Sequence, residues 1–171
     1  YLDQALDGAS DLVGFGVDWV DALRRAGADA YGTHGLPERR DEYWRYTNLN
    51  ALADEAFRLD GGAPAIGLPS LPHRRVAELA AYRVVAVNGR LRPDLCALDG
   101  LPNDVLVSSL EDLMAAAPAR LEPHLGRLIR LNQMPMAALN TAFLRDGLVM
   151  FLGDGIVLDK PVHLISITAP G

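Results

Sequence analysis

Apolar residues near the start of the chain recur at the spacing of an α-helix. Trp19 and Leu23 stand four residues apart and fall on one helical face. The pattern predicts a helix that ends at Gly27, because glycine is a common residue just past the last helical turn. Pro37 fits the first position of a second helix, and an asparagine fits the cap of a third within residues 48–57.

Glycine and proline dominate the next segment, residues 60–75, which is predicted as a linker. Residues 82–87 then read Y-R-V-V-A-V, the β-branched pattern of a strand. They run into Asn88 and Gly89, the favoured pair of a two-residue hairpin turn. The returning strand contains Pro93, which places that strand at the edge of a sheet.

Helical patterns return in the middle of the chain, after a further short strand. Ser108 and Glu111 form an S-x-x-E capping box, which predicts a helix through about residue 117. Apolar spacing predicts another helix over residues 121–129 and one more that begins at Pro135. On this last helix Asn140 shares a face with apolar residues, so its amide is expected to be partly buried and hydrogen-bonded.

The last part of the chain changes character. Three β-prone runs, residues 148–152, 156–158 and 162–167, are divided by turn residues. Closely spaced short strands of this kind suit the opening coils of a β-helix, whose rungs bury their faces against successive rungs. We therefore expect a piece of a longer protein whose exposed β edge allows self-association.

These patterns together predict an α+β fold. It consists of an N-terminal helical segment (1–59), the linker (60–75), a mixed region with a small β-hairpin and helices (76–145), and the first strands of an incomplete β-helix core (146–171).

Charge and hydropathy narrow the classes of function. The chain carries 16 Lys and Arg against 22 Asp and Glu, a net charge of −6, which argues against a nucleic-acid-binding protein. Its apolar runs are far shorter than the roughly 20 residues of a membrane span. We expect no nucleic-acid or membrane partner and a cytoplasmic location.

The sequence offers no recognisable catalytic or metal-binding constellation. Its single cysteine, Cys96, has no neighbouring ligand at metal-site spacing, and the four histidines are scattered. The motifs of dinucleotide-binding, P-loop, nucleophile-elbow and zinc-protease sites are absent. We therefore predict no catalytic, cofactor-binding or metal-binding residue, and no enzymatic activity.

The densest cluster of aromatic residues is Tyr43, Trp44 and Tyr46, three rings within four positions that are interleaved with Arg45. Arginine stacks on aromatic rings, and exposed clusters of Tyr, Trp and Arg are typical of partner recognition. The alternative is a packed helix end with the rings buried. Both interpretations remain open at the level of sequence.

Several ordered blocks of sequence resemble the N-terminal region of the SufD family. They are W-x3-L-R-R-A (19–26), G-L-P-x-R-R-x-E-x-W-R-Y-T-N-L (35–49), V-N-G (87–89), V-L-V-S-S-L (105–110), A-L-N-T-A-F-L-R-D-G (138–147) and V-L-D-K-P-V-H-L (157–164). The resemblance covers nearly the whole chain, and the E-x-W-R-Y-T block is its most specific part.

The resemblance implies a scaffold subunit of the SUF machinery for iron–sulfur cluster assembly. In that family a helical N-terminal region precedes a β-helix core and a C-terminal helical part. The core pairs with a SufB-like paralogue, and a SufC-like ATPase binds the C-terminal helices. The cluster is implied for the whole complex, and the family's cluster-building residues lie beyond residue 171, so none is assigned here. The alternatives are a free-standing adaptor that binds partners at residues 43–46, or a piece of a β-helix enzyme.

Overall fold

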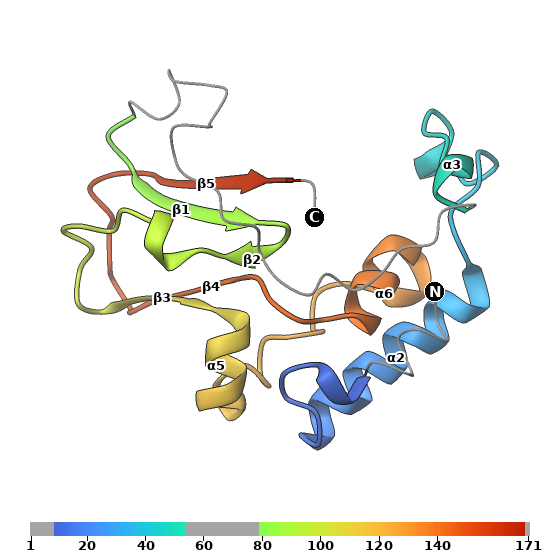
Figure 1. Cartoon of the computed structure of the whole chain (residues 1–171), viewed down its shortest axis with the longest axis horizontal. Coiled ribbons are helices and arrows are strands. Elements are labelled where there is room, and N and C mark those ends of the chain that lie inside the picture. The colour runs from blue at the N-terminus through green and yellow to red at the C-terminus, as the bar shows by residue number, and fades with distance from the viewer. Residues whose placement is uncertain (1–8, 54–78, 170–171) are drawn as a thin grey trace. The chain divides into compact units, whose positions relative to one another are not determined.

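The computed structural model describes residues 9–53 and 79–169, which belong to two compact units (Figure 1). One unit combines Tyr1–Leu59 with Leu113–Arg145 and is helical, whereas the other combines Asp60–Asp112 with Asp146–Gly171 and holds the strands. The predicted α+β class is confirmed. The predicted linker lies outside the described residues.

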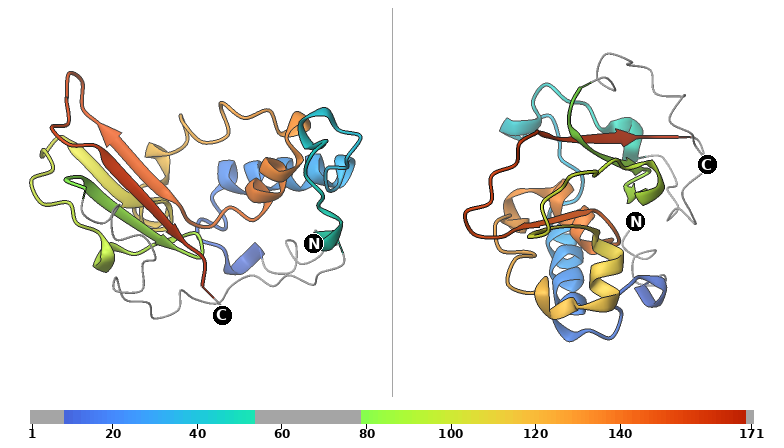
Figure 2. Two further views of the ribbon diagram at one scale, coloured as in Figure 1. Left: turned by 90° about the horizontal axis from the view of Figure 1, so that it is seen from above. Right: turned by 90° about the vertical axis from the view of Figure 1, so that its left-hand side faces the viewer.

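The helical unit is built on α2 (Asp18–His34), which packs against α6 (Pro135–Ala142) (Figure 2). The predicted end of the first helix at Gly27 is wrong, because α2 continues to His34. A Cβ at Gly27 would lie 2.7 Å from the Ala142 backbone nitrogen and 2.8 Å from the Ala138 carbonyl oxygen. Gly27 therefore does not end the helix; it allows the backbones of α2 and α6 to approach closely, because glycine has no Cβ.

The segment after α2 forms only short helical turns. The chain leaves α2 at Gly35, whose N–H donates to Tyr31 O at 2.6 Å. The helix predicted from Pro37 is absent, and a 3-10 turn at Glu42–Trp44 stands in its place. The third predicted helix is present in part as α3 (Asn50–Ala53), and Phe57 lies outside the described residues.

The remainder of this unit differs from the helical pattern of its sequence. Helix α5 (Leu110–Ala116) is followed by 3-10 turns at Pro118–Arg120 and Leu131–Gln133. The helix predicted over residues 121–129 is not formed, because the chain takes a left-handed conformation at Gly126 (φ 70°).

Helix α6 begins at Pro135 as predicted, but its buried face is not the one expected. Ala138 and Ala142 are buried against α2, whereas Asn140 is exposed. The small side chains face inward because the two helix backbones approach closely at Gly27. The predicted burial of Asn140 is wrong.

The second unit contains a three-stranded sheet in the order β2-β1-β5. Strand β1 (Tyr82–Val87) turns through Asn88 and Gly89, both with positive φ, into β2 (Arg90–Leu91), so the predicted hairpin is confirmed. On its other side β1 pairs in parallel with β5 (Val162–Ile167). Strand β2 lies at the edge of this sheet, as expected, but it ends at Leu91, so the prediction that it contains Pro93 is wrong, and Pro93 begins a 3-10 turn.

A second, two-stranded sheet joins β3 (Val105–Ser109) to β4 (Leu148–Leu152) in antiparallel register. The helix after β3 is capped by Ser109, whose Oγ accepts the Asp112 N–H at 2.8 Å. The predicted capping box at Ser108 and Glu111 is therefore wrong by one residue, because the strand runs one residue further than the pattern suggests.

The strands predicted at the end of the chain are present at 148–152 and 162–167, but not at 156–158. Strands β4 and β5 pair with β3 and β1 from earlier in the chain, and not with each other. The described residues thus hold two small sheets and no closed β-helix, and the β-helix stays a prediction.

The sheet β2-β1-β5 has an apolar core on one face. Val85, Val87 and Leu95 are buried there, and Ile165 and Ile167 pack against them. No helix among the described residues combines the length and the apolar character that a membrane crossing needs.

Candidate partner-recognition site

The aromatic block, residues 43–46, follows a turn that is held by hydrogen bonds to Asp41. The Asp41 carboxylate accepts the Glu38 N–H at 2.8 Å, and its carbonyl oxygen accepts the Trp44 N–H at 2.8 Å. The Thr47 N–H then donates to Trp44 O at 2.8 Å. These local hydrogen bonds wind residues 38–47 into successive tight turns, which is why no regular helix forms despite Pro37.

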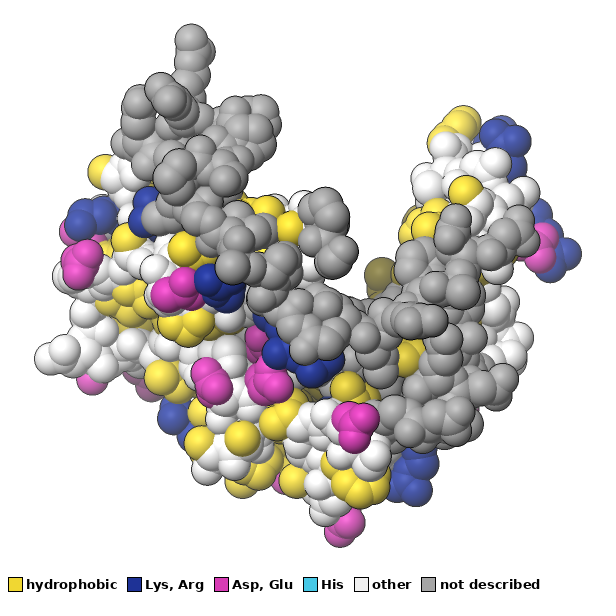
Figure 3. Space-filling model, in the orientation of Figure 1, with side chains coloured by type: hydrophobic (Ala, Val, Ile, Leu, Met, Phe, Trp, Pro, Cys, Tyr) yellow, Lys and Arg dark blue, Asp and Glu magenta, His cyan; other side chains and the backbone are white. Residues whose placement is uncertain are grey.

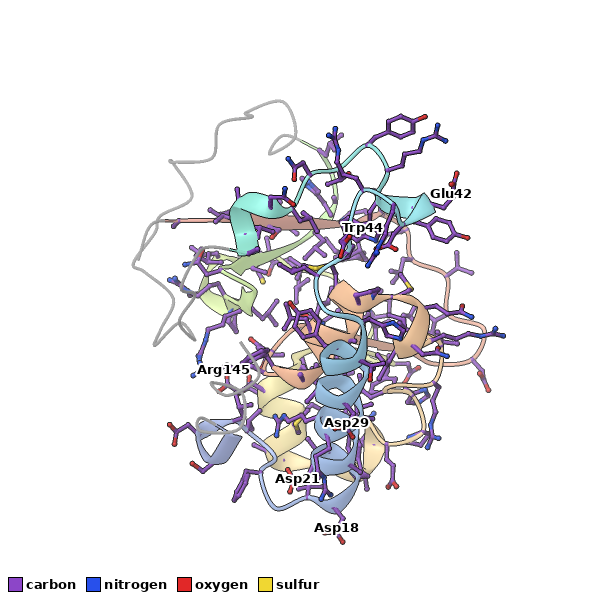
Figure 4. The ribbon with its side chains drawn as sticks, turned by 90° about the vertical axis from the view of Figure 1, so that its right-hand side faces the viewer. Asp18, Asp21, Asp29, Glu42, Trp44 and Arg145 are labelled. Atoms are coloured by element: carbon purple, nitrogen blue, oxygen red, sulfur yellow. The ribbon has the colours of Figure 1, made fainter. Side chains whose placement is uncertain are left out.

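The turn presents two of its three rings to solvent. The exposed fraction is 94% for Tyr43 and 89% for Tyr46, whereas Trp44 is half-buried. The Arg45 guanidinium lies 5.5 Å from the centre of the Tyr46 ring, within the range of a cation–π contact. Figure 4 shows Glu42 and Trp44 on this turn, in the same unit as α2.

The chemistry of this block fits binding better than catalysis. Tyr and Arg side chains offer large contact areas, planar donors and polar tips, and such residues dominate the energetics of many protein interfaces. The hydroxyl groups of Tyr43 and Tyr46 sit on exposed rings without a base positioned beside them in the described contacts. The sequence-based hypothesis of a recognition site at residues 43–46 stays a prediction.

Among the described residues, Cys96 and the histidines do not come together, and His73 lies outside those residues. Cys96 is half-buried in the strand-bearing unit, where its Sγ donates to Arg92 O at 3.2 Å and accepts the Val85 N–H at 3.3 Å. His34 and His124 are exposed, and His163 lies on β5 beside Arg83 of β1. In the described part of the chain, no three His, Cys, Asp or Glu side chains gather as metal ligands.

Sequence reasoning missed the structural part played by Arg24. This side chain is only 6% exposed, and its Nη2 donates to Val13 O at 2.6 Å and to Leu144 O at 2.7 Å. Burial lowers the pKa of Arg24, and the nearby Asp21 carboxylate partly offsets the effect. Arg24 thus ties α2 to the chain segments before and after it within the helical unit.

Asp146 was also missed, and it plays a similar part in the strand-bearing unit. Its two carboxylate oxygens accept the Leu91 N–H at 2.9 Å and the Glu111 N–H at 3.0 Å. Arg90 and Glu111 form an ion pair beside it at 3.4 Å. One side chain therefore connects β2, the start of α5 and the approach to β4.

A third contact joins β1 to the loop before β5. The Tyr82 hydroxyl lies 2.6 Å from Asp159 Oδ1 and 3.0 Å from Gly100 O, and Lys160 lies over the Tyr82 ring. The hydrogen bond raises the pKa of Tyr82 and lowers that of Asp159. The contact favours the neutral phenol and the ionised carboxylate.

Arg24, Asp146 and Asp159 all fall within the sequence blocks that resemble the SufD family. Their side chains form hydrogen bonds between distant chain segments, so at these positions the blocks contain residues that stabilise the fold. The block that contains Tyr43 to Tyr46 is different, because two of its largest side chains are left at the surface.

Comparison with known proteins identifies the family. Residues 12–164 match the family model described as the SufBD protein N-terminal region. A curated relative, an iron-sulfur cluster assembly SufBD family protein of Synechocystis sp., is 29% identical over 145 residues, which are 85% of this chain. The chain spans 32% of that relative's length. The chain belongs to the family of SufBD N-terminal regions.

Proposed function

We propose that the chain is the N-terminal part of a SufD-like scaffold protein that serves iron–sulfur cluster assembly in the cytoplasm. The observation that carries the proposal is the family match over residues 12–164. It is supported by the similarity to a SufBD family protein whose name assigns it to iron–sulfur cluster assembly. The choice of SufD over SufB rests on the motif blocks of the sequence.

The proposed role is non-catalytic. The chain contributes binding surfaces to a complex with a SufB-like paralogue and a SufC-like ATPase, and the cluster belongs to the whole complex. With one cysteine, the chain alone lacks the roughly four thiolate-type ligands that such clusters usually need. The exposed rings at Tyr43 and Tyr46 supply a surface suited to partner recognition.

A second surface is the outer edge of β5. The carbonyl oxygens of Pro161 and Ile167 accept hydrogen bonds from the backbone of the β1 hairpin. Because backbone groups alternate in direction along a strand, those of Val162, Leu164 and Ser166 point away from β1. Those groups have no hydrogen-bond partner among the described residues. We propose that copies of the 171-residue chain associate through this edge, because open strand edges pair with other strands.

Co-expression tests the proposed function. The full-length protein that contains this chain is produced with the SufB-like and SufC-like proteins of the same organism, and the complex is purified without oxygen. We expect the three to co-purify and to hold iron and sulfide after reconstitution. The isolated 171-residue chain, treated in the same way, is expected to stay colourless after desalting.

Two results would contradict the proposal. A full-length protein that co-purifies with neither partner argues for the free-standing adaptor, which the exposure of Tyr43 and Tyr46 also favours. A stoichiometric visible chromophore on the isolated chain would show that the segment itself holds a cluster.

A further inference from the structure

A cationic, aliphatic loop tip stands out on the helical unit. Arg127, Leu128, Ile129 and Arg130 are all exposed, with Leu128 93% and Ile129 50% accessible. Neither arginine forms an ion pair among the described residues. The sequence from residue 123 to 145 contains no acidic residue, although the whole chain has a net charge of −6.

The tip is fixed to the unit at its base. Gly126 has a φ of 70°, and a Cβ at this position would lie 2.5 Å from Leu23 Cδ1, so the loop backbone is pressed against α2. The Arg127 Nη2 also donates to Glu122 O at 3.3 Å. Exposed aliphatic side chains on an anchored loop incur a smaller ordering cost on binding than those on a free loop.

An acidic, aromatic corner lies at the start of α2 in the same unit. Asp11 and Asp18 are exposed and form no ion pair among the residues described, and Phe15 between them is 58% exposed. Figure 4 shows Asp18 at the N-terminal end of α2. The corner is also preformed, because Asp21 Oδ2 accepts the Gly16 N–H at 3.0 Å.

The two surfaces complement each other in charge and in apolar content. In the tip two arginines flank two exposed aliphatic residues along the chain, and in the corner two exposed aspartates flank an exposed phenylalanine. Two arginines are too few for an anionic membrane, where clusters of about four to eight cations are typical. The aliphatic tip also lacks the aromatic platforms on which nucleic-acid bases stack.

We propose that the tip (residues 127–130) of one copy binds the corner (Asp11, Phe15 and Asp18) of a second copy. The contact is heterologous, because different surfaces of the two copies meet, so association continues beyond a dimer unless a ring closes. This inference goes beyond the proposed scaffold function, and it concerns a different surface from the edge of β5.

Charge reversal tests the contact. All proteins carry Leu164→Lys, so that pairing at the β5 edge does not contribute to association. The tip variant carries Arg127→Glu and Arg130→Glu, and the corner variant carries Asp11→Arg and Asp18→Arg. Weight-average mass is measured by sedimentation at low and at high salt, and circular dichroism confirms that each variant folds.

We expect the parent to associate with rising concentration at low salt and to dissociate as salt is added. For each variant alone, we expect association to weaken by at least about tenfold, because like charges then face each other. An equimolar mixture of the two variants should associate again, since each reversed surface meets a complementary one. Arg39→Glu with Arg40→Glu, exposed residues elsewhere on the unit, changes the net charge equally and should leave association unchanged.

A parent that stays monomeric over the whole concentration range overturns the proposal. Failure of the mixed variants to associate overturns it as well, because charge complementarity would then not be the cause. Equal weakening by the Arg39 and Arg40 control would show an effect of net charge alone.

Discussion

Two charged side chains each join backbone segments that lie far apart in the chain. Arg24 binds the carbonyl groups of Val13 and Leu144, the second of them 120 residues further along the chain. Asp146 binds the N–H groups of Leu91 and Glu111. Hydrogen bonds that involve a charged group are about twice as strong as neutral ones, so a single residue can fix each junction.

Replacing Arg24 tests this account in the helical unit. Arg24→Met keeps the apolar stem but leaves the two carbonyl groups without their donors, so we expect the free energy of unfolding to fall by about 3 kcal/mol. The exposed neighbour supplies the control, because Arg25→Met should change it by less than about 0.5 kcal/mol. Urea denaturation measures both. Equal midpoints for the two variants would show that the Arg24 hydrogen bonds add nothing.

The Tyr82–Asp159 contact predicts a dependence on pH. The pKa of Asp159 is lowered by the hydrogen bond, so the contribution of the contact is complete above the ordinary value of 3.8 and is lost as pH falls through the lowered pKa. The pKa of Tyr82 is raised, so the contribution is complete below 10.0 and is lost as pH rises through the raised pKa.

Thermal unfolding of the parent and of Tyr82→Phe measures this dependence. We expect the parent to melt at the higher temperature, by a margin that is constant between about pH 5 and pH 9 and shrinks on either side. A margin that does not change down to pH 2 would mean that ionised Asp159 is not the partner of the hydroxyl.

The long-range hydrogen bonds of single side chains were the features that the sequence predicted least well. Nothing in the local pattern distinguishes Arg24 from Arg25, since the carbonyl groups that Arg24 binds come from other parts of the chain. Asp146 was equally hidden, because its partners stand 35 and 55 residues away. The sequence left open whether the rings at residues 43–46 are buried; Tyr43 and Tyr46 are exposed, and the recognition role of this cluster stays a prediction.

At the scale of elements, local patterns identified most strands and helices but not their partners. The hairpin at Asn88 and Gly89 followed from the φ values that its turn requires. The parallel pairing of β1 with β5 joins segments about 80 residues apart, which no local pattern encodes. The helix predicted over residues 121–129 is replaced by turns, and the positive φ of 70° at Gly126 interrupts a right-handed helix there.

The crossing of α2 and α6 predicts a strong effect at one glycine. In Gly27→Ala the new methyl group would meet the backbone of α6 at 2.7–2.8 Å, so the helices must separate, and we expect a loss of about 2–3 kcal/mol in unfolding free energy. Gly32 lies in the same helix but is exposed, so Gly32→Ala should stabilise by about 0.5–1 kcal/mol. A Gly27→Ala variant as stable as Gly32→Ala would contradict the close crossing.

The open edge of β5 leads to a prediction about association. Leu164→Lys places a charge on this edge, where lysine is a common means of preventing strand pairing. Val157 is 87% exposed and lies outside the strands, so Val157→Lys is the matched control. At high salt, which suppresses contacts between charged surfaces, light scattering should show association of the parent and of Val157→Lys but not of Leu164→Lys. Association of all three to the same extent would exclude the edge as the contact.

At the scale of the whole molecule, the two units are interleaved along the chain. The helical unit takes its parts from both sides of the hairpin, and the strand-bearing unit takes β4 and β5 from the last part of the sequence. A division into consecutive regions, as composition suggests, does not show this arrangement. Charged side chains of both signs are spread in small groups over the coloured part of the face in Figure 3.

We propose that residues 43–46 recognise a partner in an assembly complex. Titration of the full-length protein with the SufB-like and SufC-like proteins tests this role by comparing the parent with a variant that carries Tyr43→Ala and Tyr46→Ala. Because both rings are almost fully exposed, the double variant should melt at the parent's temperature. Its affinity for at least one partner should fall about tenfold or more, as expected for aromatic residues that dominate an interface. A control with Arg39→Ala and Arg40→Ala should bind like the parent. Unchanged affinity of the tyrosine variant for both partners would contradict the claim.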